Sequence, residues 1–191
     1  MGGMLQIRLS GSGGQGLILA GRILAAALVA AGRRVAQSQS YEPTSRGGLS
    51  RADLVVTDAP ADFPLVTALD YLVILDERAA HASDDLLAAG SVVLCDTRRV
   101  TSRISGPFAL HRLPLWETAI GVGSPRVANI VALGALAAIG GIVAPDLLRQ
   151  KVVGLAPPRF RDLNAEAFDT GYELAAHAPT VARPSQPSAM L

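Results

Sequence analysis

The chain has 191 residues, of which 50% are hydrophobic and 17% are charged, and its formal net charge is +1. This length supports one domain with its own core, and so apolar a composition indicates burial against partner subunits. Aromatic residues make up only 4% of the chain, so we expect neither a nucleic-acid partner nor a membrane-interface belt.

Cys95 is the single cysteine. One thiol cannot form an intrachain disulfide, an iron–sulfur site or a structural zinc site, so no metal site is predicted in this chain. We expect the thiol to be buried and inert, because no histidine or basic residue adjoins it. The first residues lack a charged region followed by a long apolar stretch, and a cytoplasmic protein without a membrane span is expected.

The first hundred residues alternate predicted strands with predicted helices. Residues 5–9 alternate apolar and polar side chains and then meet glycines, which is typical of a strand that ends in a turn. A helix is expected over 17–31, ended by Gly32 in a left-handed cap. The further predicted strands are 34–40, 52–57, 71–75 and 92–95, and a second helix is predicted over 77–89.

The second half of the chain is predicted to be largely helical. Residues 108–113 form a candidate edge strand, and helices are expected over 116–122, 125–139, 145–153 and 162–177. The apolar stretch from Val127 to Val143 is at the short limit for a transmembrane helix and contains Asn129, so a helix buried on all sides is preferred.

These elements predict an α/β fold, with a Rossmann-like, mostly parallel sheet flanked by helices and a helical C-terminal part. One domain is expected over residues 1–177. The tail, residues 178–191, contains three prolines and little to bury, and we expect it to be extended or wrapped on a partner.

A glycine-rich loop follows the first predicted strand and precedes the first predicted helix. Residues 11–16 read GSGGQG and fit the pattern G-x-G-x-x-G, whose backbone amides can approach a phosphate at a helix N-terminus. The alternative is that the glycines only allow close strand–helix packing. Classical NAD binding also requires an acid at the end of the second strand, and here the first carboxylate is Glu42, already followed by Pro43.

A second polar loop, SYEPTSRGG, starts at Ser40 and precedes the third predicted strand. In a doubly wound sheet the loops after the first two strands emerge side by side, so Arg46 and Arg51 would face the glycine loop and could clamp an anionic ligand. The alternative is a subunit-docking loop in which Arg51 pairs with Asp53 or Asp58. For Arg51 we prefer the pairing, and for Arg46 both interpretations stay open.

No catalytic residue is predicted. The serines at 10 and 12 and the histidines at 81, 111 and 177 form no nucleophile–base pattern, and no acids are paired at a helical spacing that suits acid–base chemistry. We therefore expect no independent enzymatic activity from this chain.

Five segments occur together in order: IRLSGSGGQGLILAGRILA, QSQSYEPTSRGGLSRADLVVTD, LDYLVILDE, NIVALGALAA and LNAEAFDTGY. In this combination the chain resembles the gamma subunit, or gamma domain, of the 2-oxoacid:ferredoxin oxidoreductases over residues 7–172. The glycine loop alone is a weak signal, whereas the glycine loop together with QSQSYxPxxRGGxSRADxxxxD is specific.

The resemblance implies a complex that oxidatively decarboxylates a 2-oxoacid with thiamine diphosphate and Mg, and transfers the acyl group to coenzyme A. It implies thiamine-binding alpha and beta subunits as partners, together with a ferredoxin-like subunit that holds iron–sulfur clusters and passes electrons to ferredoxin or another acceptor. The gamma module is then a Rossmann-like domain that contributes coenzyme A binding and active-site closure.

Carried over by position, the resemblance implies a coenzyme A site in the two loops. Single-chain pyruvate enzymes carry a lysine pair where this chain has Thr44 and Ser45, so Arg46 is the implied substitute. The implied site residues are Gly11, Ser12, Gly13, Gly14, Gln15, Gly16, Tyr41, Ser45, Arg46, Gly47 and Gly48.

The substrate stays open among 2-oxoglutarate, pyruvate, branched-chain oxoacids and aryl oxoacids such as phenylglyoxylate, with a preference for an aryl oxoacid or 2-oxoglutarate. The SYEPTSRGG loop argues against an indolepyruvate enzyme, because those enzymes usually carry a different loop at this place. The competing interpretation of the whole chain is a free-standing Rossmann-type nucleotide-binding module with a regulatory role.

Overall fold

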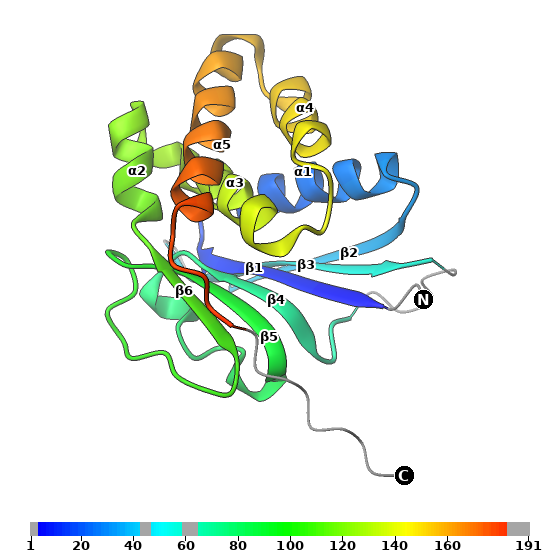
Figure 1. Ribbon diagram of the computed structural model, residues 1–191, viewed down its shortest axis with the longest axis vertical. Coiled ribbons are helices and arrows are strands. Elements are labelled where there is room, and N and C mark those ends of the chain that lie inside the picture. Colours follow the sequence, from blue (N-terminus) through cyan, green and yellow to red (C-terminus); the bar gives the residue numbers. More distant parts are fainter. Residues whose placement is uncertain (1–3, 43–46, 59–64, 183–191) are drawn as a thin grey trace.

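A six-stranded sheet of order β2-β3-β1-β4-β5-β6 forms the centre of the computed structural model, which describes residues 4–42, 47–58 and 65–182 (Figure 1). The strands are β1 (Leu5–Ser12), β2 (Arg34–Tyr41), β3 (Leu49–Thr57), β4 (Leu69–Ile74), β5 (Leu87–Asp96) and β6 (Ala109–Leu113). Strand β3 is antiparallel to both of its neighbours, and the other pairings are parallel. The sheet is therefore mostly parallel, as predicted.

All five α-helices lie on one face of this sheet (Figure 1). They are α1 (Leu17–Ala30), α2 (Leu115–Val122), α3 (Ala128–Gly140), α4 (Pro145–Leu155) and α5 (Arg161–Ala176). The predicted helical C-terminal part is thus confirmed, and each of these helices begins and ends within three residues of its predicted bounds. Gly32 also caps α1 as expected, with φ of 84° and a hydrogen bond from the Arg33 amide to the Leu28 carbonyl (3.0 Å).

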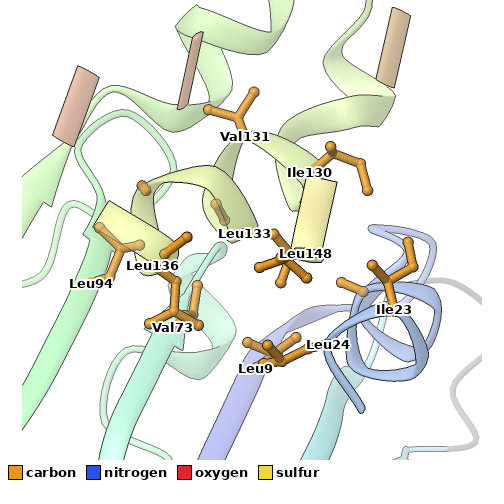
Figure 2. Close-up of a cluster of buried hydrophobic side chains, with 14 of the residues drawn as sticks. Leu9, Ile23, Leu24, Val73, Leu94, Ile130, Val131, Leu133, Leu136 and Leu148 are labelled. Carbon is orange, nitrogen blue, oxygen red and sulfur yellow. The ribbon is translucent and has the colours of Figure 1, made fainter. Parts of the chain in front are cut away.

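The core on this helix face is almost purely aliphatic. Figure 2 shows Leu9 and Val73 of the sheet meeting Leu24 of α1, Leu136 of α3 and Leu148 of α4. Helix α3 is buried on all sides from Ala128 to Ala137, which explains why its sequence lacks a polar face. The buried-helix interpretation of the stretch from 127 to 143 is confirmed for residues 128–137, whereas residues 138–142 are partly or fully exposed.

Two glycines let α3 and α5 pack with their backbones in contact. A Cβ atom at Gly134 would collide with the Phe168 carbonyl oxygen, and one at Gly171 would collide with the Val131 carbonyl oxygen. Only glycine therefore fits at either position.

The opposite face of the sheet carries no α-helix in the described residues, and here one prediction is wrong. Residues 77–89 form two 3-10 turns, η1 (Glu77–Ala79) and η2 (Asp84–Leu86), and then enter β5. The Asp76 side chain caps η1, and Arg51 donates to the Ala82 carbonyl oxygen (2.8 Å). These contacts tie the segment to the sheet, so its backbone cannot close a regular helix.

The order of the first strands also differs from the expected doubly wound arrangement. Strands β2 and β3 form a hairpin, and β3 inserts between β2 and β1. The tip of the hairpin still reaches the edge where β1 ends, because β3 begins beside Ser12.

The described part of the predicted tail packs Ala178 and Val181 against the helix-face core. The division into a domain of residues 1–177 and a tail of residues 178–191 stays a prediction. Within the ranges that the structure describes, no helix combines the length and the apolar character needed to cross a bilayer.

Candidate functional site

The glycine turn, residues 11–16, connects β1 to α1 at the edge where the parallel strands end. Gly11 and Ser12 still belong to β1, and Gly16 is the N-cap of α1 in the left-handed conformation, with φ of 73°. Gly14 also has a positive φ, of 91°. The strand–turn–helix context that gives G-x-G-x-x-G its meaning is present.

Two amide side chains hold this turn. Gln15 accepts a hydrogen bond from the Ser12 amide (2.8 Å) and donates one to the Leu75 carbonyl oxygen at the end of β4 (3.0 Å). Asn129 of α3 donates to the Gly16 carbonyl oxygen (2.9 Å). Neither Gly11 nor Gly16 has room for a Cβ, because the Gln15 and Asn129 side chains occupy that space.

The two middle glycines are placed differently. Gly13 and Gly14 are exposed to solvent, and a Cβ at Gly14 would meet nothing within 4 Å. The packing interpretation therefore applies to Gly11 and Gly16, whereas Gly13 and Gly14 leave the backbone open to a ligand. Helix α1 has no side-chain cap and no acid in its first turn, so its N-terminal partial positive charge is not neutralised by a capping side chain.

The second predicted loop lies directly beside the glycine turn. The Gly13 amide donates to the Gly48 carbonyl oxygen (2.9 Å), and Gly47 has a φ of 73°. Glu42 closes the neck of the hairpin, since its amide donates to the Leu49 carbonyl oxygen (2.9 Å) and its carboxylate accepts from the Leu49 amide (3.1 Å). Tyr41 is exposed on the hairpin. Ser45 and Arg46 lie outside the described residues.

The predicted pairing of Arg51 is wrong. Asp53 instead accepts two hydrogen bonds from Arg8, both at 2.7 Å and buried, and Asp58 pairs with Arg33 at 2.7 Å. Arg51 donates to the Ala82 carbonyl oxygen beneath the sheet, and burial, reinforced by the nearby charge of Arg8, lowers the pKa of its guanidinium. Arg51 therefore supports the segment after β4 rather than clamping a ligand.

Sequence reasoning missed Arg78. It lies in η1, after β4, and its Nη1 is 3.4 Å from the position that a Cβ of Gly47 would occupy. Its side chain is 55% exposed and is 3.6 Å from the buried carboxylate of Asp76. The available signal was topological, because residues that follow a neighbouring parallel strand emerge at the same edge as the glycine turn.

The described residues offer neither a reactive thiol nor a set of metal ligands for redox or nucleophilic chemistry. Burial, the largest cause, raises the pKa of the Cys95 thiol to about 11, so Cys95 is no candidate for a thiolate ligand. The described ranges hold no cluster of three or more side chains suited to a metal ion. What the site can do chemically is hold an anion at the uncapped N-terminus of α1, with the Arg78 guanidinium beside the adjoining hairpin.

Comparison with known proteins identifies relatives over nearly the whole chain. Residues 6–174 match the family model described as pyruvate ferredoxin/flavodoxin oxidoreductase. The 2-oxoglutarate synthase subunit KorC of Methanocaldococcus jannaschii is 38% identical over 174 residues, which cover 89% of this chain and 93% of that protein.

Two solved structures extend the comparison. The gamma subunit of a keto/oxoacid ferredoxin oxidoreductase from Geobacter sulfurreducens is 40% identical, with a TM-score of 0.82 over 91% of this chain and 97% of that one. The 2-oxoglutarate:ferredoxin oxidoreductase of Magnetococcus marinus, solved with 2-oxoglutarate, coenzyme A and succinyl-CoA, is 25% identical, with a TM-score of 0.81 over 95% of this chain and 33% of that one.

Proposed function

Because this chain belongs to the pyruvate ferredoxin/flavodoxin oxidoreductase family, we propose that it is the gamma subunit of a complex that oxidises 2-oxoglutarate and that it binds the coenzyme A substrate. The observation that carries the coenzyme A role is the exposed backbone of Gly13 and Gly14 at the uncapped N-terminus of α1. An arrangement of this kind binds phosphate oxygens, which coenzyme A carries in its nucleotide half.

The choice of 2-oxoglutarate rests on the relatives. The M. jannaschii protein is named as a 2-oxoglutarate synthase subunit, and the M. marinus complex was solved with 2-oxoglutarate. Aryl oxoacids such as phenylglyoxylate, which the sequence left open, have no comparable support.

The redox cofactors belong to partner subunits in this proposal. Thiamine diphosphate would supply the decarboxylation chemistry, and iron–sulfur clusters would carry the electrons to ferredoxin or another acceptor. The described residues of this chain do not fit an iron–sulfur cluster, since its single thiol is buried and protonated, and they contain no cluster of three or more side chains that could hold the Mg of thiamine diphosphate. Its own task is to bind and orient coenzyme A beside a site built by the alpha and beta subunits.

Gly13→Ala tests the coenzyme A role in a complex reconstituted with alpha, beta and ferredoxin-like subunits. The nearest atom to an added Cβ would be 3.7 Å away, so the fold has room for the methyl group and only a ligand lying against the exposed backbone of the turn would meet it. We expect the KM for coenzyme A to rise about tenfold, if roughly 1.4 kcal/mol of phosphate contact is lost. Gly154→Ala, where an added Cβ meets nothing within 4 Å, is the matched control.

An unchanged coenzyme A KM in Gly13→Ala would reject the coenzyme A role. The substrate is tested in the same complex by comparing kcat/KM for 2-oxoglutarate, pyruvate and phenylglyoxylate. A higher value for either of the other two acids would reject 2-oxoglutarate. If the chain bound a nucleotide alone and never joined the complex, the free-standing regulatory module would be the better interpretation.

A further inference from the structure

We propose that Arg78 is the phosphate-binding cation of the glycine turn, so that the anion site is built from three segments rather than two. These segments are the glycine turn after β1, the hairpin tip at Gly47 and Gly48, and η1 after β4. The inference rests on the proposed coenzyme A function and names the residue that gives the site its charge.

The hairpin contacts both of the other segments. The Gly13 amide is hydrogen-bonded to the Gly48 carbonyl oxygen at 2.9 Å. The Arg78 guanidinium lies against Gly47, the residue before Gly48, where a Cβ would be 3.4 Å from Nη1 and 3.7 Å from Cζ. Any larger side chain at Gly47 would therefore crowd Arg78 as well as strain a positive φ.

Among the residues that the structure describes, the Arg78 guanidinium makes no hydrogen bond and keeps its donors. Its one ionic partner among the described residues is Asp76, at 3.6 Å, and that carboxylate is already engaged by Arg99 at 2.7 Å. A guanidinium has five N–H donors in a fixed fork. With more than half of its side chain exposed, Arg78 has donors free to meet an incoming phosphate.

Two other described arginines near this edge, Arg51 and Arg99, are engaged elsewhere. Arg51 is held by the Ala82 carbonyl oxygen on the opposite face of the sheet from the helices. Arg99 is held by Asp76, and its guanidinium lies 5.8 Å from the centre of the Trp116 ring.

A second, independent observation points to a missing ligand at the turn. Asn129 is only 4% exposed, and its side chain is directed at Gly16. Its Nδ2 donates to the Gly16 carbonyl oxygen, but its Oδ1 is buried and has no hydrogen-bond partner among the described residues. Native structures seldom leave a buried amide oxygen unpaired, so this atom marks a polar partner that is absent from the isolated chain.

The chemistry of the site selects phosphate. Exposed amides at a helix N-terminus and a planar guanidinium both favour an oxyanion with several oxygens, which arginine can contact through two parallel N–H···O bonds. Lysine offers only a point charge and would not reproduce that geometry.

The test compares Arg78→Ala and Arg78→Lys with Arg98→Ala in the reconstituted complex. Arg98 is the matched control, because it is 70% exposed and its Nε lies 3.9 Å from Glu117. We expect Arg78→Ala to raise the KM for coenzyme A about tenfold, Arg78→Lys to raise it several-fold, and Arg98→Ala to leave it unchanged. The KM for 2-oxoglutarate should stay the same in all three.

Pantetheine, an acyl acceptor without phosphates, separates phosphate binding from a merely structural role. Arg78→Ala should leave the kcat/KM for pantetheine unchanged, and an equal loss with pantetheine and coenzyme A would overturn the proposal. Arg46→Ala tests the competing cation from the hairpin. A rise in coenzyme A KM with Arg46→Ala but not with Arg78→Ala would also reject Arg78.

The coenzyme A function and the role of Arg78 can be rejected separately. If Gly13→Ala raises the coenzyme A KM and Arg78→Ala does not, the coenzyme A function stands and the role of Arg78 is wrong. If neither variant changes that KM, both are wrong.

Discussion

Both faces of the sheet bury aliphatic side chains, but among the described residues the face opposite the helices also buries an ion pair. On the helix face, aliphatic side chains fill the space beneath five helices, and α3 and α5 approach so closely that glycine is required at their contact. On the opposite face, a buried ion pair between Arg8 and Asp53 holds the segment after β4, since Arg8 also donates to Ser83 at 2.9 Å. The helix face therefore depends on close aliphatic packing, whereas the opposite face, called the charged face below, adds charge pairing to its own aliphatic cluster and carries Arg78.

The largest expected effect comes from breaking the buried ion pair. Asp53→Ala leaves Arg8 buried without a counter-charge, and we expect the free energy of unfolding to fall by about 3–5 kcal/mol. Asp58→Ala removes the partly exposed partner of Arg33 and should cost less than about 1 kcal/mol. Urea denaturation of both variants measures the difference. Equal losses of unfolding free energy would mean that the buried Arg8–Asp53 pair stabilises the fold no more than the partly exposed Arg33–Asp58 pair does.

The corresponding change on the helix face is Gly171→Ala. An added Cβ collides with the Val131 carbonyl oxygen, so α5 must shift away from α3, and we expect a loss of about 1–3 kcal/mol. Gly154→Ala in α4 is the control, because it adds a methyl group in open space and should be neutral or slightly stabilising. A Gly171→Ala protein as stable as the control would show that α3 and α5 can move apart at this contact without a loss of stability.

A smaller, pH-dependent effect distinguishes the charged face from the aliphatic one. Hydrogen bonds from the Ser102 hydroxyl and the Thr101 amide lower the pKa of Glu77 from 4.5 to about 2. A carboxyl with a lowered pKa contributes stability above pH 4.5 and loses it as the pH falls towards 2. Glu77→Gln should therefore unfold more readily than the parent at pH 7.

The stability difference between Glu77→Gln and the parent should shrink between pH 4.5 and pH 2. Because Glu77 lies at the surface, solvent screening keeps the effect small. Thermal unfolding across that pH range measures it. A difference that stays constant with pH would show that ionisation of Glu77 is not its cause.

The smallest expected effect is at Cys95, in the core of the charged face. Burial raises the pKa of its thiol to about 11, so iodoacetamide at pH 8 should leave the folded protein unlabelled and react readily in urea. In Asp53→Ala, labelling should accelerate if the segment after β4 opens locally. Rapid labelling of the folded parent protein would contradict the predicted burial.

Most elements of the fold followed from local sequence features. Alternation, continuous apolar runs, the glycine cap at Gly32 and the G-x-G-x-x-G turn depend on residues close together in the chain, and the structure confirms each of them. The apolar stretch from 127 to 143 was also interpretable, because it is at the short limit for a membrane span and contains Asn129, whose amide is costly in lipid.

The predicted helix over 77–89 failed because its sequence has helical composition but its environment does not permit a helix. Contacts from Arg8 and Arg51, which lie more than 30 residues earlier in the chain, hold Ser83 and Ala82 in place. The pairing of Arg51 failed for a related reason. Asp53 is two residues away on the same strand, but the register with β1 places it opposite Arg8.

The sequence by itself determined the family, the positions of most strands and helices, and the glycine turn, because each depends on short-range patterns or on motifs in a recognisable order. Only the tertiary structure decided which arginine lies against Gly47 beside the turn and which glycines of the turn are exposed. Those outcomes depend on strand order, on register and on a segment that reaches the turn from a neighbouring strand. Long-range pairing of this kind leaves no periodicity in a single sequence, so Arg78 could be found only once the chain was folded.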